Sequence, residues 1–432
     1  MNAAPAERRA FGRLCVMMFL QYAVWGAWLP VAGRYISAPL ADGGLGFTAG
    51  QLSMILGAAG SIGAISAPFI AGQFADRWFS SERFLAFLLV IGGVLNWALS
   101  TQVSYEAWLW LTIAYGIVFM PTLALSNSIA FSHLSDREND FPRVRVWGTI
   151  GWIAASWAFP MIWLQSDLLL GWMPPFLTGP EVPGVTSRLS DALVFSALIS
   201  FGYAAFCFFL PNTPPQRDGV EPLAFKSAFA LFAKPSFAIL VVVSLAISAI
   251  HNIYFIQAGP FLSSVGLLDS QIGPALTIGQ FSEILFMAML GWFLHRFGFR
   301  TVIMVGALAY FTRYMIWSMT DLPVSLLIGS VVLHGICYAC FFASAFIFVD
   351  RLAPADIRGS AQTVFGIMIL GGGPVLGGKL SAFLGERYTT AGVLDFSPLW
   401  SFLAWIGLIA ACVFLVFFRD PTRDAAGAEA TR

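Results

Sequence analysis

Long apolar stretches separated by short polar segments dominate this chain of 432 residues. A membrane-spanning helix needs about 20 mostly apolar residues, and twelve stretches come close to that length. They lie near residues 12–36, 51–75, 83–101, 107–131, 144–165, 188–210, 234–262, 271–293, 300–318, 323–349, 359–384 and 396–418. In lipid, only helices and closed barrels satisfy the backbone polar groups, and these stretches are too long and too weakly alternating for barrel strands. The pattern therefore predicts an all-α membrane protein with twelve transmembrane helices.

The polar segments between the spans predict how the chain is divided. Residues 211–233, "PNTPPQRDGVEPLAFKSAFALFA", form the most polar internal segment. We expect an N-terminal six-helix bundle over 1–210, a cytoplasmic linker over 211–233, and a C-terminal six-helix bundle with a cytoplasmic tail over 234–432. Residues 166–187 are rich in Pro and Gly, which predicts an extracytoplasmic loop between spans 5 and 6.

Basic residues predict the orientation of the spans. Of 23 Lys and Arg, all but Arg34, Arg188, Arg313, Lys379 and Arg387 fall on the side that carries both termini. Because positive charge is retained in the cytoplasm, we expect cytoplasmic termini and a multi-pass protein of the inner membrane.

Composition agrees with a membrane protein and argues against other classes. Charged residues make up 11% of the chain, against about 25% in soluble domains. The net charge is zero, which argues against a nucleic-acid partner. Cys337 and Cys340 form a C-x-x-C inside an apolar stretch, where we expect packing and neither a metal nor a redox role. "GPVLGGKL" (373–380) lacks the final Ser or Thr of a phosphate-binding loop and follows no predicted strand, so we expect no cofactor.

One carboxylate interrupts an apolar span. In "ALTIGQFSEILFMAMLGWF" (275–293), Glu283 would cost about 2.5–3.5 kcal/mol to insert in ionised form. Ionisable residues in spans usually face a cavity and serve function, so Glu283 is the leading candidate to carry a proton. Gln280 lies three residues earlier, on the same helical face, where it could bind solute. The structural alternative is a Gln–Glu pair that only fixes helix packing.

The turn after span 2 carries a family motif. "GQFADRWFSSER" contains Gly72, Asp76 and Arg77, and "GWFLHRFGFR" follows span 8 at a spacing of about half the chain. This turn resembles the loop motif of the major facilitator superfamily. The resemblance implies two pseudo-symmetric six-helix halves, and a gating role for Gly72, Asp76 and Arg77 with Arg358 at the start of span 11. The second copy departs from the motif because His295 stands at the acid position.

A narrower resemblance extends over nearly all of the chain. "FLQYAVWGAWLP" (19–30), "FMPTLALSNSIAF" (119–131), "FPRVRVWGTIGW" (141–152), "GQFSEILF" (279–286) and "VDRLAPADIRGSAQTVFGIMILGGG" (349–373) resemble the bacterial nucleoside:proton symporter family. The resemblance implies a secondary transporter in the lipid bilayer, and we expect it to be a monomer. It would import nucleosides by alternating access with proton symport, through a site between the halves near the bilayer midplane.

Several polar and aromatic side chains are candidates for binding such a solute. Gln21 with Trp25, and Arg145 with Thr149 and Trp152, recur at helical spacing, so each set shares one face of its helix. An aromatic plane and an amide would suit a nucleobase, and a guanidinium would suit ribose hydroxyls. Core packing of Trp and positive-inside placement of Arg145 are the alternatives. The remaining candidates are Asn127, Asn252 and Tyr338. Tyr338 recurs with His334 and Phe341 at helical spacing, so we expect these three to share one face of span 10.

Span 10 departs from the resembling families, which carry an acid there. Between Asp321 and Asp350 this chain has none. Proton coupling would then rest on Glu283, aided by His334 or Arg313, or the transporter would not be proton-coupled. His334 matches a histidine in the related lactose permease pattern, although a lone His more often packs as a hydrogen-bonding residue. The alternative functions are a sugar or oligosaccharide:proton symporter and a metabolite or drug exporter. A membrane enzyme is disfavoured because no nucleophile–base set appears.

Overall fold

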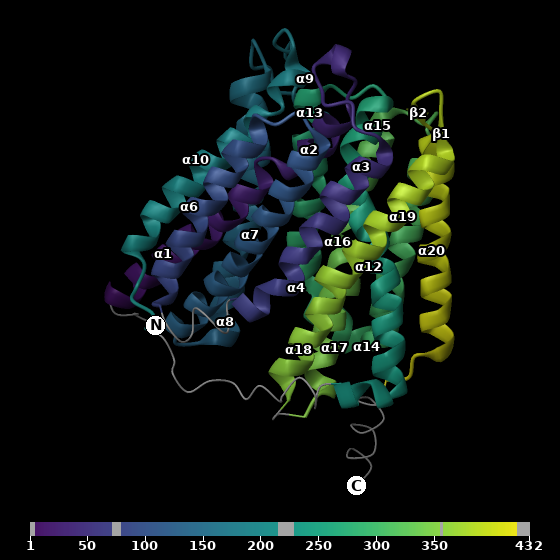
Figure 1. Cartoon of the computed structure of the whole chain (residues 1–432). Helices are drawn as coiled ribbons and strands as arrows, with labels where there is room; N and C mark the ends of the chain where they lie inside the picture. The colour runs from purple at the N-terminus through teal and green to yellow at the C-terminus, as the bar shows by residue number, and fades with distance from the viewer. Residues whose placement is uncertain (1–4, 71–78, 215–228, 355–356, 421–432) are drawn as a thin grey trace. The chain divides into compact units, whose positions relative to one another are not determined.

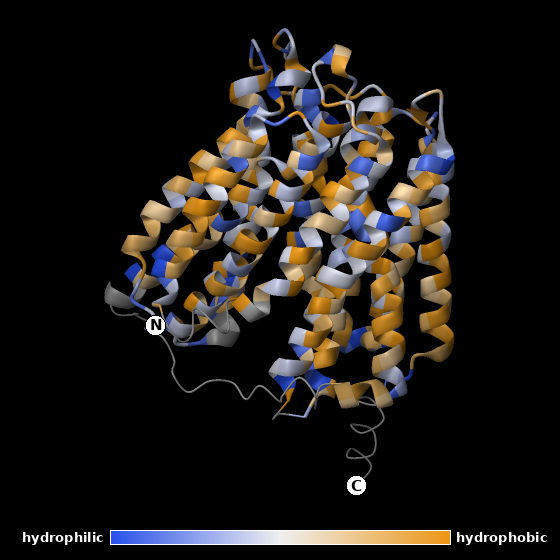
Figure 2. Ribbon diagram, in the orientation of Figure 1, coloured by the Kyte–Doolittle hydropathy of each residue, from blue (hydrophilic) through white to orange (hydrophobic). Residues whose placement is uncertain are grey.

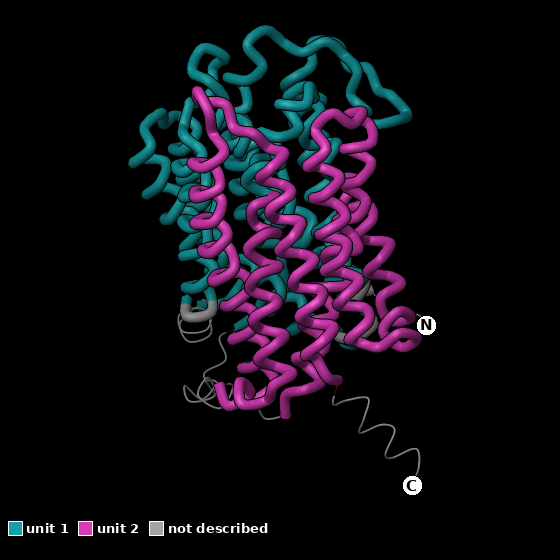
Figure 3. The backbone as a smooth tube through the Cα atoms, turned by 90° about the vertical axis from the view of Figure 1, so that its right-hand side faces the viewer, with its two compact units in different colours: residues 1–219, 255–277 teal, residues 220–254, 278–432 magenta. Residues whose placement is uncertain are grey.

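The computed structural model describes residues 5–70, 79–214, 229–354 and 357–420. The chain forms two compact units, and Figure 3 colours them separately. Unit 1 holds residues 1–219 and 255–277, and unit 2 holds residues 220–254 and 278–432. Residues 255–277 belong to the predicted C-terminal bundle but pack within unit 1. The expected division at 211–233 into two bundles stays a prediction.

Unit 1 is built from helices (Figure 1). Its elements are α1 (Pro5–Gly26), α2 (Leu29–Ser37), η1 (Leu40–Asp42), α3 (Ala49–Ser53), η2 (Met54–Ala59), α4 (Gly60–Ile70), α6 (Ser81–Ser100), α7 (Tyr105–His133), α8 (Arg137–Phe159), η4 (Pro160–Leu164), α9 (Val185–Arg188), α10 (Asp191–Phe206), η5 (Cys207–Phe209), the second part of α12 (Pro235–Ser264) and α13 (Asp269–Leu276). Helix α1 packs along α8, α4 along α7, and α6 along α10.

Unit 2 is also helical, apart from one short hairpin. Its elements are η6 (Ala230–Ala233), the first part of α12, α14 (Ile278–Ser318), α15 (Val324–Gly329), η7 (Ser330–Val332), α16 (Leu333–Ile336), η8 (Cys337–Ala343), α17 (Ser344–Leu352), α18 (Arg358–Ile367), η9 (Met368–Gly372), α19 (Gly373–Tyr388), β1 (Thr389–Thr390), β2 (Val393–Leu394) and α20 (Phe396–Phe417). Strands β1 and β2 pair antiparallel. Helix α14 packs against α20 and against the α16–η8 segment.

The described helices agree with the twelve predicted spans. Ten helical stretches of the described chain are long and apolar enough to cross a membrane. One of them, Asp269–Ser318, has 50 residues and contains two spans. The two are separated at Gly298, whose φ of 76° belongs to the left-handed region that favours glycine. Helix α8 corresponds to span 5 and starts in the charged segment "REND". Apolar residues dominate along the helices, and polar residues gather toward their ends (Figure 2).

Glycines set how closely helices α1 and α8 approach. A Cβ added at Gly26 would lie 2.7 Å from the carbonyl oxygen of Trp152, and one added at Gly151 would lie 2.0 Å from that of Phe19. Only residues without a Cβ permit this backbone contact. The close approach places the candidate side chains of α1 and α8 next to one another.

Candidate functional site

Unit 1 brings three predicted aromatic and amide residues together. The rings of Trp25 and Trp152 lie 5.8 Å apart, edge to face, and Trp25 also meets Phe119 of α7 at 5.9 Å. The Trp152 ring in turn lies 6.5 Å from the ring of Phe255 in α12. Gln21 is fully buried one turn before Trp25. The cluster therefore combines aromatic edges and faces with an amide, as the helical spacing predicts.

Arg145 lies over an aromatic ring of the neighbouring helix. Its Cζ is 4.1 Å from the centroid of the Tyr22 ring, which is a cation–π distance. Arg145, Thr149 and Asn127 are all partly buried. The guanidinium is thus held at the α1–α8 interface by stacking, and its role in binding solute stays a prediction.

Three of the predicted amide residues share one feature: a buried side-chain oxygen without a hydrogen-bond partner in the described structure. These oxygens belong to Gln21, Asn252 and Gln280. For Gln21 the orientation of the amide is fixed, because its Nε2 donates to Thr122 Oγ1 at 2.8 Å while that hydroxyl donates to the Phe119 carbonyl at 2.5 Å. A buried acceptor left unpaired costs about 1–3 kcal/mol. Such an atom would gain from a ligand that donates an O–H or N–H.

Unit 2 holds the predicted proton-binding residues. Glu283 is partly buried on α14. The preceding residue, Ser282, accepts a hydrogen bond from the backbone N–H of Gly335 at 3.0 Å. A Cβ added at Gly335 would lie 2.5 Å from the Glu283 nitrogen. The α14 segment that carries Glu283 is therefore in backbone contact with the α16 segment that carries His334.

His334 belongs to a buried network centred on Arg313. Arg313 is fully buried, and its Nη1 lies 2.8 Å from His334 Nδ1. A guanidinium only donates hydrogen bonds, so Nδ1 of His334 accepts this one. The Arg313 guanidinium also lies 4.2 Å from the centroid of the Tyr254 ring. While the bond from Arg313 lasts, His334 cannot take a proton on Nδ1. Its predicted role in proton coupling therefore requires that this bond breaks, and it stays a prediction.

A π-helical segment alters the expected face of span 10. Residues 337–343 form the π-helix η8, so α-helical spacing does not extend from His334 to Phe341. Tyr338 is partly buried, with its ring 6.0 Å from that of Phe342. Phe341 is fully buried against Gly306 of α14. The shared face expected for His334, Tyr338 and Phe341 is not maintained.

The predicted gating residues are described only in part. Gly72, Asp76 and Arg77 lie outside the described residues. Arg358 begins α18, and its Nε lies 3.8 Å from Asp350 Oδ2, with about half of each side chain exposed. Exposed pairs of this kind contribute about 0–1 kcal/mol. A gating role for Arg358 stays a prediction.

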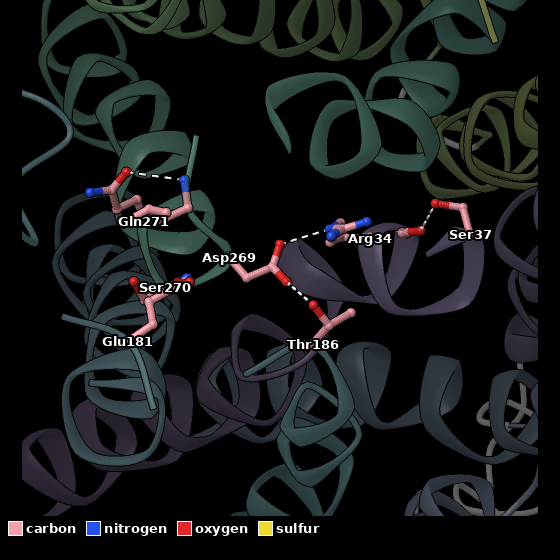
Figure 4. A network of polar contacts seen from close by, with 9 residues as sticks. Arg34, Ser37, Glu181, Thr186, Asp269, Ser270 and Gln271 are labelled. Carbon is pink, nitrogen blue, oxygen red and sulfur yellow. Dashed lines mark hydrogen bonds and ion pairs between the residues drawn. The ribbon is translucent and has the colours of Figure 1, made fainter. Parts of the chain in front are cut away.

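A polar network in unit 1 was not anticipated from the sequence (Figure 4). Arg34 of α2 forms an ion pair with Asp269, the first residue of α13, at 2.7 Å between Nε and Oδ1. The other carboxylate oxygen of Asp269 accepts a hydrogen bond from Thr186 Oγ1 of α9 at 2.6 Å. Beside it, Glu181 Oε1 accepts from the backbone N–H of Ser270 at 2.7 Å. Arg34 and Asp269 stand 235 positions apart, so no local pattern relates them.

The segment expected to be a loop, 166–187, is more ordered than the sequence suggests. Antiparallel bridges join Gln165 to Glu181 and Leu170 to Leu177, and α9 follows. Leu177 is fully buried, and its carbonyl accepts a hydrogen bond from Gln271 Nε2 at 2.6 Å. The hairpin 165–181 is thereby fixed to α13.

Comparison with known proteins places this architecture in a family. The sequence matches the nucleoside H⁺ symporter family over residues 10–423. YegT of Escherichia coli (strain K12) is 32% identical over 95% of this chain and 94% of its own length. Xanthosine permease of the same organism is 31% identical over 95% of this chain and 97% of its own length. The crystal structure of nucleoside transporter NupG matches with a TM-score of 0.80 and 26% identity, covering 95% of this chain and 99% of that one.

These matches confirm the predicted major facilitator fold and the transporter class, and they exclude an enzyme. The resemblance noted in the sequence is thus confirmed along almost the whole chain. This multi-pass membrane protein belongs to the nucleoside H⁺ symporter family.

Proposed function

We propose that this transporter imports nucleosides across the inner membrane and takes up the coupled proton on Glu283. The observation that carries the proposal is the carboxyl itself, which lies partly buried in the apolar helix α14 of a nucleoside H⁺ symporter family member. Span 10 offers no acid between Asp321 and Asp350. Glu283 is therefore the carboxyl within a span that is best placed to exchange a proton.

Solute recognition is assigned to two groups of residues. In unit 1, Trp25 and Trp152 would contact the base while Gln21 and Arg145 bind polar groups. In unit 2, the Asn252 and Gln280 amides and the Tyr338 hydroxyl would contribute further hydrogen bonds. The support is the shared set of unpaired amide oxygens, because the ribose hydroxyls and base N–H groups of a nucleoside are hydrogen-bond donors. Thr149 and Asn127, both partly buried, would bind the solute as well.

Orientation and oligomeric state complete the proposal. All but five of the 23 basic residues fall on the side of the termini, which supports cytoplasmic termini by the positive-inside rule. One chain carries both six-helix halves, so a monomer embedded in lipid is sufficient for alternating access.

The test is Glu283→Gln in proteoliposomes, with Glu386→Gln, at an exposed position on α19, as the matched control. One proton moving through 100 mV supplies about 2.3 kcal/mol, enough for roughly 50-fold accumulation. We expect Glu283→Gln to lose this proton-driven accumulation of labelled uridine or adenosine while exchange of solute across the membrane continues. The control should accumulate normally. Uphill uptake at the normal rate by Glu283→Gln would remove Glu283 from the coupling step.

A further inference from the structure

The network around Asp269 joins segments that are far apart in the chain. Within unit 1, α2 ends span 1, α9 and the hairpin 165–181 lie between spans 5 and 6, and α13 begins span 8. Helix α13 packs against α2, α8, α9 and η4. These contacts therefore link a segment of the second predicted half, α13, to segments of the first. They lie at the C-terminal end of span 1.

The ion pair at the centre of this network is short and shielded. The side chains of Arg34 and Asp269 are 17% and 5% exposed. Both oxygens of the carboxylate are used, one by Arg34 and one by Thr186. By contrast, the Arg143–Asp140 pair measures 3.4 Å, with side chains 72% and 29% exposed. A charge-assisted bond that is shielded from water is stronger than an exposed one, so the pair at Asp269 holds α2 and α13 together.

The backbones are in contact beside the same pair. A Cβ added at Gly33 of α2 would lie 2.5 Å from the carbonyl oxygen of Ile256 in α12, and one added at Gly259 would lie 3.3 Å from the Arg34 nitrogen. On α13, a Cβ at Gly273 would lie 2.7 Å from the Ser156 carbonyl oxygen of α8. Helices in such contact leave no room for a solute between them, so a solute can pass here only if α12 and α13 separate from α2 and α8.

We propose that Arg34, Asp269 and Thr186, with the Glu181–Ser270 bond beside them, form a latch that holds the solute pathway closed at the extracytoplasmic end, and that a proton on Glu181 favours the closed state. With cytoplasmic termini, as proposed above, this end of span 1 is extracytoplasmic.

The proton dependence follows from the surroundings of Glu181, which lies outside the spans. The charged groups that face it are Asp269 of α13 and Arg34 of α2. Burial raises the pKa of Glu181, and the negative charge of Asp269 raises it further, while the hydrogen bonds from Ser270 and the charge of Arg34 lower it. The net direction is upward, so the closed state binds the proton more tightly than an open, hydrated state would. A fall in external pH through this range therefore favours closure, and a rise in pH favours opening.

The experiment measures access to a thiol placed behind the latch. Thr277→Cys puts the thiol at the end of α13, where the native hydroxyl accepts a hydrogen bond from Trp157 Nε1 of α8 at 2.9 Å and the residue is 1% exposed. Right-side-out vesicles are treated with a membrane-impermeant maleimide, and the parent without this cysteine gives the background of the five native thiols. Trp172→Cys, at a position that is 99% exposed, corrects for the effect of pH on thiol reactivity.

We expect the thiol at position 277 to react slowly, and about tenfold or more faster when Asp269→Asn or Arg34→Gln breaks the shielded pair. The combined charge exchange Arg34→Asp with Asp269→Arg should restore slow labelling. If these variants do not fold, Thr186→Val removes one hydrogen bond and should speed labelling about fivefold. Labelling of Asp269→Asn and Arg34→Gln, or of Thr186→Val, at the unmodified rate would overturn the latch.

The pH arm uses Glu181→Gln, which imitates the protonated carboxyl. With Glu181 present, corrected labelling should slow as external pH is lowered. In Glu181→Gln it should stay at the slow rate throughout, and an unchanged pH dependence would refute the role of Glu181. Because labelling needs no solute, its outcome is independent of the uptake test of Glu283.

Discussion

The buried amide of Gln21 offers the sharpest test of the solute site. Gln21 is fully buried, donates to Thr122 Oγ1 at 2.8 Å, and leaves its own Oε1 without a partner in the described structure. The substitution Gln21→Leu keeps the side chain at a similar size. It removes one hydrogen bond, worth about 0.5–1.5 kcal/mol, and also removes the unpaired acceptor, which costs about 1–3 kcal/mol.

These two contributions oppose one another in the solute-free protein. We therefore expect Gln21→Leu to leave thermal stability in detergent unchanged or slightly raised. In the complex, the substitution removes a bond that satisfies a buried acceptor. A loss of about 1–3 kcal/mol in binding corresponds to a rise in KM of roughly 5- to 150-fold.

The assay pairs nucleoside uptake by proteoliposomes with a thermal unfolding scan of the same preparation. The matched control is Asn96→Leu, because Asn96 is also fully buried and its Nδ2 donates to a hydroxyl, Ser196 Oγ, at 3.0 Å. That bond joins α6 to α10, two helices that carry none of the proposed solute-binding residues. Because Asn96 Oδ1 also lacks a partner in the described structure, the control should behave like Gln21→Leu in the thermal scan, but it should leave KM unchanged. A destabilised Gln21→Leu with normal KM would show that Gln21 serves packing alone.

Three further substitutions test other parts of the molecule. Arg145→Lys keeps the charge but loses the planar stacking on Tyr22, so the KM measured by uptake should rise about 2- to 30-fold. An unchanged KM would assign Arg145 to membrane topology. Gly151→Ala places a Cβ 2.0 Å from the Phe19 oxygen and should destabilise the protein by about 1–3 kcal/mol in thermal scans. The control Gly202→Ala, whose added Cβ meets nothing within 4 Å, should leave stability unchanged. Equal Tm values for the two variants would contradict the tight α1–α8 contact. Arg358→Gln breaks an exposed ion pair and should change stability by less than about 1 kcal/mol. Slower transport at an unchanged Tm would support a gating role for Arg358, and normal transport would argue against that role.

The sequence predicts best what depends on local periodicity. Apolar length locates the spans, and the helical spacing of Gln21 and Trp25 correctly predicts that they share a face of α1. Local spacing does not predict that Trp25 and Trp152 lie 5.8 Å apart. That contact also depends on the glycines that let α1 and α8 approach closely. Such glycines can be read in a sequence, but their partners cannot.

Features that depend on distant segments or on irregular helices escape the same reasoning. Nothing near Arg34 in the chain indicates that it pairs with Asp269. In the sequence, Arg34 stands out only as one of the five basic residues that do not fall on the side of the termini. In span 10, the π-helix η8 breaks the 3.6-residue period, so the face expected for His334, Tyr338 and Phe341 is not maintained. The bond from Arg313 to His334 Nδ1 is likewise tertiary, and it changes what the histidine can do.

A proton can drive a conformational cycle only if it binds differently in the states that it connects. The two carboxyls proposed here would meet that requirement at different steps: Glu283 would link the proton to solute, and Glu181 would link it to closure of the latch. The roles are separable by experiment, because Glu283→Gln should abolish accumulation but keep the pH dependence of labelling, while Glu181→Gln should do the reverse. If either substitution removed both effects, a single titrating group would govern the whole cycle, and the assignment of two would be wrong.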